Sequence, residues 1–364
     1  MKSSDFKIIT EGITKVLVYS SKIKDKGPGS KEGMPFYNPA MELNRDLSIV
    51  ICQWIINNSK KHINLCDGLA ASGIRGIRFA NELTGNFTVT INDWNKDAYD
   101  LIQKNLEIIK PDNVVVTNKD LNTVLSENRF DYIDIDPFGS PVYFFDSAVK
   151  SIKDNGIISF SATDTAALCG VYPKACLRRY GAVSFHSPVM KETGLRILIG
   201  SIAKTAGEYD KTIQPLISYS TDHYFRAYVR IKNDKSSSIN EFSTIKSNML
   251  SLNDTENLDV GPLWTGKLQD KKSISELISV LFEKRLNTKN MVWKMLDLLE
   301  EEADAPAFYY NTDDLASVLK KSPPKMKTIF EKLKNEGYGV YRTHFSPTGF
   351  KTDAPVNVIE KMFK

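Results

Sequence analysis

Short hydrophobic runs alternate with amphipathic stretches from about residue 62 to residue 232. The runs contain many β-branched and aromatic residues and end in polar ones, which is typical of β-strands. They predict seven strands, at 62–67, 87–93, 113–120, 130–136, 156–164, 214–221 and 224–231. Apolar residues at helical spacing predict helices between them, near 73–83, 95–107, 143–153 and 190–206. Strands that alternate with helices favour a mostly parallel, doubly wound α/β sheet.

The last two predicted strands lie close together and predict an antiparallel hairpin at the edge of this sheet. A seven-stranded sheet ending in a hairpin resembles the class I methyltransferase variant of the Rossmann-like fold. The polar segment 233–258 predicts a linker, which divides the chain into a domain at 1–232 and a smaller one at 259–364. The smaller domain has amphipathic helical patterns at 273–284 and 289–301. A helix, a turn, a second helix and a β-ribbon then follow, which predicts a winged-helix-like α+β domain.

The composition is that of a soluble globular protein, with 41% hydrophobic and 25% charged residues. No apolar run is long enough to span a membrane, and the N-terminus shows no secretory signal. The four histidines have no metal-ligand spacing, and the cysteines form no CxxC pair; they are Cys52, Cys66, Cys169 and Cys176. A reducing, cytoplasmic setting is therefore expected.

The net charge of +4 is too small to indicate a nucleic-acid partner by itself. Its distribution says more, because the loop at 20–33 and the tail from Lys320 onward are both locally basic. Such patches can bind nucleic acid. Two solvated surfaces would explain the same charges.

The first four predicted strands each end in an acidic residue: Asp67, Asp93, Asp120 and Asp136. One such carboxylate is common as a helix N-cap. Four of them are expected to converge on one crevice, because ligands of open α/β sheets bind outside the carboxyl ends of the strands.

The loop "CDGLAASGIRG" at 66–76 is rich in small residues, which let the backbone approach a ligand closely. It matches neither GxGxxG nor a P-loop, which disfavours a nicotinamide dinucleotide or ATP. Asp93 is placed to accept hydrogen bonds from ribose hydroxyls, and Asp120 from an adenine amino group. S-adenosylmethionine carries both groups and no pyrophosphate. A tight turn with Asp caps would explain any one of these positions equally well.

The stretch Asp136, Pro137, Phe138 and Gly139 suits the methylation of a base amine. Such an amine is a poor nucleophile because its lone pair is delocalised into the ring, so it must be oriented and must lose a proton. Asp136 can accept one N–H bond and the carbonyl of Pro137 the other, while Phe138 stacks on the base. An Asp-Pro turn followed by a core Phe is the structural alternative.

A second candidate region, "PFYNPAMELNRD" at 35–46, precedes the first of these strands. Phe36 could stack on the opposite face of the base bound by Phe138. Arg45 could pair with the methionine carboxylate of the cofactor. A core aromatic and a surface arginine are the alternative interpretations.

Five blocks in order carry a family resemblance: "FYNPAMELNRD", "LAASGIRGIR", "DYIDIDPFGSPVYFFDSA", "SATDTAALCG" and "STDHYFRAYVRI". Together they resemble the archaeal form of the Trm1 family, the tRNA (guanine(26)-N2)-dimethyltransferases. The resemblance is strong over about 10–232 and weaker through "GPLWTGKL" at 261–268 and beyond.

This resemblance implies S-adenosyl-L-methionine as the methyl donor and N2 of guanosine 26 in tRNA as the acceptor. It implies a catalytic role for Asp136, with Pro137 beside it, and base stacking by Phe36 and Phe138. The cofactor is expected to bind the following residues: Arg45, Asp67, Arg75, Asp93, Asp120 and Leu121. The C-terminal domain is expected to recognise the shape of the tRNA. Arg342, His344 and Lys351 are its candidate contacts.

Two departures from the family pattern are visible. Position 121 is usually Ala and is Leu121 here, which a backbone contact would tolerate. Many members carry four cysteines with metal-ligand spacing in the linker, whereas 233–258 has none, so no metal is expected. The remaining alternatives are an amino-methyltransferase of DNA or ribosomal RNA and a non-catalytic RNA-binding protein. The oligomeric state stays open, with a monomer plausible.

Overall fold

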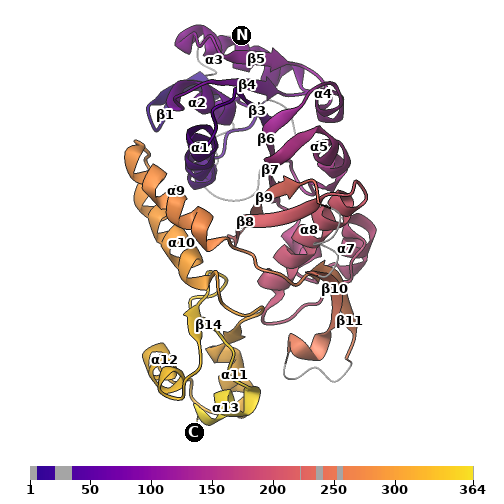
Figure 1. The fold of residues 1–364 in the computed structure, drawn as a ribbon, viewed down its shortest axis with the longest axis vertical. Coiled ribbons are helices and arrows are strands. Elements are labelled where there is room, and N and C mark those ends of the chain that lie inside the picture. The colour runs from indigo at the N-terminus through magenta and orange to yellow at the C-terminus, as the bar shows by residue number, and fades with distance from the viewer. Residues whose placement is uncertain (1–5, 21–34, 222, 235–240, 252–256, 364) are drawn as a thin grey trace.

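The computed structural model describes residues 6–20, 35–221, 223–234, 241–251 and 257–363. Its centre is a seven-stranded sheet in the order β5-β4-β3-β6-β7-β9-β8 (Figure 1). The five strands from β5 to β7 are parallel, and β9 is antiparallel to both of its neighbours. The strands are β3 (Ile63–Asp67), β4 (Phe87–Asn92), β5 (Val114–Thr117), β6 (Phe130–Ile135), β7 (Ile152–Ala162), β8 (Thr212–Ser220) and β9 (Phe225–Lys232). The predicted doubly wound sheet with a terminal hairpin is confirmed.

Helices cover both faces of the sheet, so the hydrophobic core has two parts (Figure 1). One face is covered by α4 (Leu121–Glu127), α5 (Phe145–Ser151) and α8 (Met190–Gly207). The other is covered by α1 (Glu42–Asn57), α2 (Ile74–Glu82) and α3 (Lys96–Ile109). Burial on both faces explains why β6 and β7 are rich in large apolar residues.

Several elements were not predicted from the hydrophobic pattern. They are α1, α4, α6 (Thr165–Leu168), α7 (Pro173–Tyr180) and the hairpin of β1 (Phe6–Glu11) with β2 (Thr14–Tyr19). Helix α1 has no clear amphipathic pattern because most of its length is buried, including several polar side chains. The β1-β2 hairpin packs on α2 and α3, beside the sheet.

The described part of the predicted linker 233–258 contains strand β10 (Phe242–Lys246). β10 pairs with β11 (Asp259–Trp264), and β11 packs on α8. Helices α9 (Lys271–Glu283) and α10 (Lys289–Glu302) pack on α1. The polar residues of β10 therefore form a strand because they pair with β11, which packs on α8. The local sequence pattern does not reveal these partners. The predicted division into domains remains a prediction.

The C-terminal segment forms a small unit with its own hydrophobic core, at the lower end of Figure 1. Helices α11 (Thr312–Leu319) and α12 (Met326–Asn335) precede the ribbon of β13 (Val340–Arg342) and β14 (Gly349–Thr352). Strand β12 (Tyr310–Asn311) adds to the same sheet, and α13 (Val356–Lys361) closes the unit. This order agrees with the predicted winged-helix-like arrangement.

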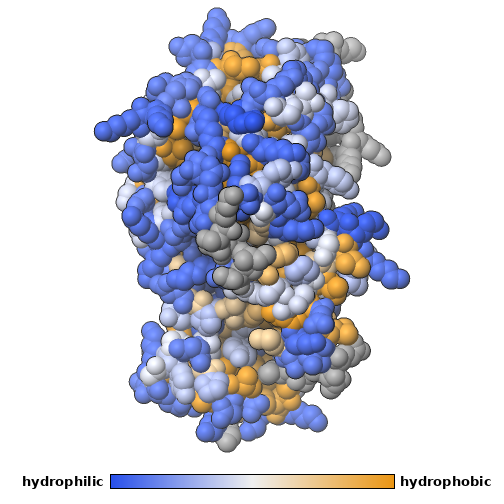
Figure 2. Space-filling view, turned by 45° about the vertical axis from the view of Figure 1, so that its right-hand side comes forward, coloured by the Kyte–Doolittle hydropathy of each residue, from blue (hydrophilic) through white to orange (hydrophobic). Residues whose placement is uncertain are grey.

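The surface view in Figure 2 shows hydrophobic side chains exposed beside hydrophilic ones around the middle of the molecule. No helix among the described residues is both long and apolar enough to cross a membrane.

Candidate active site

Three of the four predicted acidic residues lie at one edge of the sheet. Asp67 is the last residue of β3, Asp93 directly follows β4, and Asp136 directly follows β6. These strands are parallel neighbours. The convergence expected from the sequence is therefore present for Asp67, Asp93 and Asp136.

The prediction that Asp120 ends the third strand is wrong. β5 ends at Thr117, and Asp120 is the exposed N-cap of α4, where its carboxylate accepts the N–H of Asn122 at 2.9 Å. Asn118 donates to the backbone oxygen of Asp93 at 2.8 Å and turns the chain out of the sheet. Asp favours such a cap over a strand position because its carboxylate satisfies a free helix N–H. Asp120 still lies near the same edge, directly before the buried Leu121.

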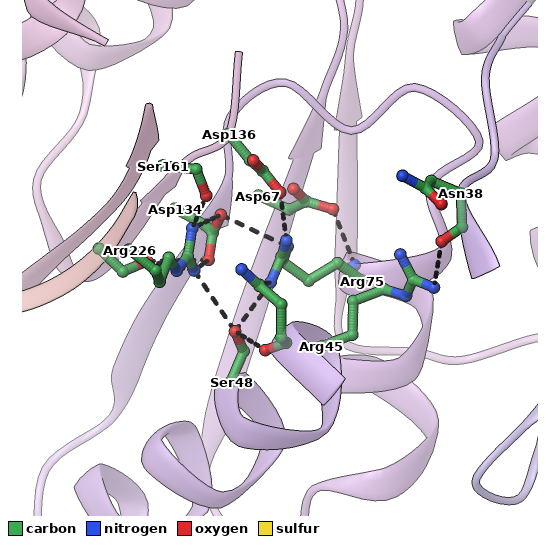
Figure 3. Close-up of polar contacts among 12 residues, drawn as sticks. Asn38, Arg45, Ser48, Asp67, Arg75, Asp134, Asp136, Ser161 and Arg226 are labelled. Atoms are coloured by element: carbon green, nitrogen blue, oxygen red, sulfur yellow. Dashed lines mark hydrogen bonds and ion pairs between the residues drawn. The ribbon is translucent and has the colours of Figure 1, made fainter. Parts of the chain in front are cut away.

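Arg75 connects the site residues from the first turn of α2 (Figure 3). Its Nη2 donates to Oδ2 of Asp136 at 2.6 Å, and its Nε lies 3.4 Å from Oδ1 of Asp134. Its Nη1 donates to Asn44 and Ser48 of α1, both at 2.8 Å. Burial alone would lower the pKa of Arg75, but Asp134 and Asp136 raise it overall. The guanidinium therefore stays charged and fixes one oxygen of Asp136.

Behind Arg75 lies a fully buried ion pair of Asp134 on β6 and Arg226 on β9 (Figure 3). Arg226 Nη2 donates to Asp134 at 2.5 Å, and the hydroxyls of Tyr132 and Ser159 donate to the same oxygen at 2.7 and 2.8 Å. Burial alone would raise the pKa of Asp134, but Arg226 and Arg75 hold it below its usual value. The charges of Asp134 and Arg226 cancel, and Asp134 also helps to hold the guanidinium of Arg75 in place.

Asp67 is buried beneath the loop that follows β3. Its Oδ2 accepts the backbone N–H of Gly76 at 2.8 Å. Burial raises the pKa of Asp67 to about 7, although Arg75 acts in the opposite direction. Asp67 therefore stabilises the start of α2 and does not face open solvent.

Asp93 holds the loop that follows β3 and the turn that follows β4. Its two oxygens accept the backbone N–H groups of Ala71 at 2.7 Å and Asn95 at 2.9 Å. Burial raises the pKa of Asp93, and these two hydrogen bonds lower it in part. A carboxylate has about four acceptor positions, so Asp93 retains acceptor capacity for a ligand, as does the exposed Asp120.

Phe138, two residues after Asp136, packs against Phe36, and the predicted stacking of both rings on a base stays a prediction. Their ring centroids are 5.8 Å apart and the ring planes are inclined by 56°. Phe138 is 42% exposed, so part of its ring is accessible to a ligand. Gly139 has φ of 93° and faces open space where a Cβ would lie, so the chain turns away from the site there.

Arg45 is buried, so the alternative of a surface arginine is wrong, and its guanidinium is already paired. Its Nε donates to Glu11 at 2.8 Å, its Nη2 also pairs with Glu11, and Nη2 donates to the carbonyl of Asn38 at 3.0 Å. Burial alone would raise the pKa of Glu11, but Arg45 and Arg78 lower it overall. Any carboxylate bound by Arg45 must share the guanidinium with Glu11.

The chain matches the model of a family described as "N2,N2-dimethylguanosine tRNA methyltransferase" over residues 12–249 and 238–364. A tRNA (guanine(26)-N(2))-dimethyltransferase of Methanobrevibacter smithii is 36% identical, with 100% of this chain and 98% of that protein covered. Its counterpart in Pyrococcus furiosus is 38% identical, with 98% of each chain covered. A solved complex of Trm1 from Pyrococcus horikoshii with S-adenosyl-L-methionine superposes with a TM-score of 0.86 and 34% identity, covering 98% of this chain and 100% of that one.

The chain belongs to the N2,N2-dimethylguanosine tRNA methyltransferase family.

In this member of the N2,N2-dimethylguanosine tRNA methyltransferase family, several residues that line or support the site were not predicted from the sequence. They are Glu11, Asn44, Ser48, Asp134 and Arg226. Asp134 and Arg226 had a usable signal, because each is a charged residue that lies between two apolar residues of a predicted strand. A buried charge needs a partner, so the two positions could have been paired.

Two of the three predicted tRNA contacts in the C-terminal unit are not on the surface. Lys351 lies 3.0 Å from Glu192 and 2.9 Å from Glu302, and it is almost fully buried. His344 pairs with Glu302 at 2.5 Å. These two side chains compensate buried carboxylates of α8 and α10, whereas Arg342 is exposed. Residues 21–33 of the predicted basic loop lie outside the described residues.

The prediction that this family member needs no metal stays a prediction. Within the described ranges, no group of three or more His, Cys, Asp or Glu side chains is arranged to hold a metal ion. The four cysteines are buried free thiols.

Proposed function

We propose that the chain transfers one or two methyl groups from S-adenosyl-L-methionine to the exocyclic N2 of guanosine 26 in tRNA. Membership of the family makes the protein an S-adenosylmethionine-dependent tRNA methyltransferase. The position on tRNA follows from relatives that match this chain along its whole length and are named for guanine 26. The cytoplasm remains the predicted setting.

The residues at the edge of the sheet suit the chemistry of the cofactor. Asp93 and Asp120 offer carboxylate oxygens to ribose hydroxyls and to the adenine amino group. The loop at 66–76 and the backbone of Leu121 would lie against the rest of the cofactor. Beneath them, Asp67 holds the backbone of Gly76, and Arg75 holds the carboxylate of Asp136. When bound, the cofactor supplies an electrophilic methyl group on a sulfonium.

Asp136 carries this proposal, because one of its oxygens is fixed and the other is available. Oδ2 accepts from Arg75 at 2.6 Å, while Oδ1 has no hydrogen-bond partner among the described residues, and the side chain is 21% exposed. Oδ1 can therefore accept an N–H of the guanine amine, and the carbonyl of Pro137 can accept the second. The amine nitrogen bonds to the methyl carbon as the carbon–sulfur bond breaks. The amine proton passes to Asp136 or to water.

Phe138 and Phe36 are proposed to hold the base, but their rings must first separate. A base between two rings needs carbon contacts of about 3.5 Å on each side, or roughly 7 Å between the ring planes. The present centroid distance of 5.8 Å is too short. Entry of the base would replace the Phe36–Phe138 contact with two stacking contacts, and the base would have to leave its own stack.

The test is transfer of labelled methyl to an unmodified tRNA transcript, with nucleoside analysis of the product. A second transcript with adenosine at position 26 serves as the control. N2-methylated guanosine in the first transcript alone is the expected result. Labelling of both transcripts would reject position 26, and labelling of neither, with the cofactor bound, would reject tRNA methylation.

A further inference from the structure

A segment that begins three residues after β7 carries basic and exposed apolar side chains. Residues 165–191 contain Lys174, Arg178, Arg179 and Lys191 and no acidic residue. Val171, Tyr172 and Leu177 are exposed by 51%, 62% and 53%. Lys174 and Arg178 are exposed and have no ion-pair partner within the described residues. We call Val171, Tyr172, Lys174, Leu177 and Arg178 the α7 face.

The backbone beneath the α7 face is well fixed. The N–H groups of Val171 and Tyr172 both donate to the carbonyl of Ala166, and the carbonyl of Tyr172 accepts two N–H groups of α7. At Gly170 a Cβ would lie only 2.3 Å from the backbone nitrogen of His186, so this turn packs directly on the next loop. The exposed side chains therefore stand on a rigid support.

Hydrogen bonds connect this support to the loop of Asp136. Gly139 donates its N–H to Oγ1 of Thr163 at 2.7 Å and accepts the N–H of Thr163 at 2.9 Å. The next residue, Asp164, accepts from Arg179 at 2.9 Å and from the hydroxyl of Tyr180 at 2.6 Å. Both loops follow the carboxyl ends of neighbouring strands. The α7 face thus has a fixed position relative to the candidate catalytic carboxylate.

We propose that the α7 face binds the tRNA beside the target nucleotide, an inference that rests on the proposed function. Lys174 and Arg178 contact phosphates, and Tyr172 stacks on a neighbouring unpaired base. Positive charge without acidic residues matches a polyanion, and aromatic stacking suits bases of any sequence. The α7 face would therefore position the strand while Asp136 and Phe138 act on one base.

The first test measures the dissociation constant of the full-length protein for an unmodified tRNA transcript over a series of KCl concentrations. The double variant Lys174→Ala/Arg178→Ala should bind more weakly, and the slope of log affinity against log salt should fall by about one for each lost phosphate contact. The matched control is Lys60→Ala/Lys61→Ala, which removes two exposed lysines before β3, at the opposite edge of the sheet. The control should behave as the wild type does.

The second test separates stacking from charge. Tyr172→Ala should raise the KM for tRNA roughly 5- to 150-fold, the range expected for loss of one base–aromatic stack. Tyr172→Phe keeps the ring, so its KM for tRNA should stay close to that of the wild type. Cofactor binding, measured by calorimetry, should be the same in all variants, because the substituted side chains are exposed.

The outcomes distinguish this inference from the proposed function. If the wild type methylates guanosine 26 and the double variant matches its tRNA affinity and salt slope, the α7 face is not a tRNA surface, and its apolar residues would suit a protein partner instead. If the wild type binds tRNA through Lys174 and Arg178 but does not methylate position 26, the α7 face stands and the proposed function fails.

Discussion

Arg75 and Asp136 form an ion pair of 2.6 Å that joins helix α2 to the loop after β6. The pair holds one carboxylate oxygen against the protein and leaves the other without a hydrogen-bond partner among the described residues. A carboxylate held in this way cannot rotate freely. In the proposed reaction, its remaining oxygen would therefore be oriented before the substrate binds, which would lower the entropic cost of reaching the reactive geometry.

Asp136→Asn should reduce turnover by about 10²- to 10⁴-fold, the range for loss of a positioned proton acceptor. The amide keeps the shape of the side chain but accepts a proton poorly. Single-turnover methyl transfer measures the effect, and calorimetry should show that cofactor binding persists. Asp259→Asn, at an exposed carboxylate, is the control. Wild-type turnover in Asp136→Asn would remove Asp136 from the reaction.

Phe138→Ala should weaken productive tRNA binding by about 1–3 kcal/mol, because one face of the base loses its stacking partner. The ring is 42% exposed, so the free energy of unfolding should change little. The value of kcat/KM with tRNA measures the loss. Phe282→Ala removes a ring of 60% exposure on α9 and should leave kcat/KM unchanged. An equal effect of both variants would indicate that stacking at Phe138 is not specific.

Arg226→Met should lower the free energy of unfolding by about 3–5 kcal/mol, because it leaves the buried carboxylate of Asp134 without its main partner. Urea unfolding gives this value. Arg129→Met, at an exposed arginine, should have little effect.

A second variant tests the cause of this loss. Adding Asp134→Asn to Arg226→Met removes the unpaired charge and should recover part of the stability. No recovery would show that packing, not the unpaired charge, dominates the cost.

Asp67 should make stability depend on pH. Its pKa is raised from 3.8 to about 7 in the folded protein, so folding favours the protonated form. The stabilisation of the folded protein by protonated Asp67 is fully present below about pH 4 and is lost as the pH rises to about 7. Its upper limit is about 4 kcal/mol.

The measurement for Asp67 is urea unfolding at several pH values, for the wild type and for Asp67→Asn. The Asn side chain cannot titrate but still accepts from Gly76. The unfolding free energy of the wild type, relative to that of the variant, should fall between pH 4 and pH 7. Parallel pH profiles would show that Asp67 titrates normally.

Lys351→Met should destabilise the protein by about 3 kcal/mol or more, because Glu192 and Glu302 lose a buried cation. Burial alone would raise the pKa of Glu302, but His344 and Lys351 lower it far below its usual range. Thermal unfolding measures the effect. Lys334→Met, on the exposed side of α12, is the control. If Lys351→Met left the stability unchanged and weakened tRNA binding, Lys351 would be a tRNA contact, as predicted from the sequence.

Much of the central fold could be predicted from the hydrophobic pattern. All seven strands of the main sheet and the terminal hairpin lie close to their predicted positions, because the apolar residues that these strands bury form short runs between polar segments. The position of Asp136 followed from the same pattern, since the apolar run ends directly before it. Helix α1 was harder to predict because its buried polar residues obscure its period.

The partners of the charged residues emerge only from the packing of distant segments. Arg226 and Asp134 are 92 positions apart, and Arg45 and Glu11 are 34 apart. Whether such side chains meet depends on which strands become neighbours and on how the β1-β2 hairpin docks. The sequence therefore indicated which residue types end the strands, whereas tertiary contacts made Arg45 a buried partner of Glu11 and Lys351 a buried partner of two carboxylates. A buried charge is stable only beside its counter-charge, and only the folded chain brings the two together.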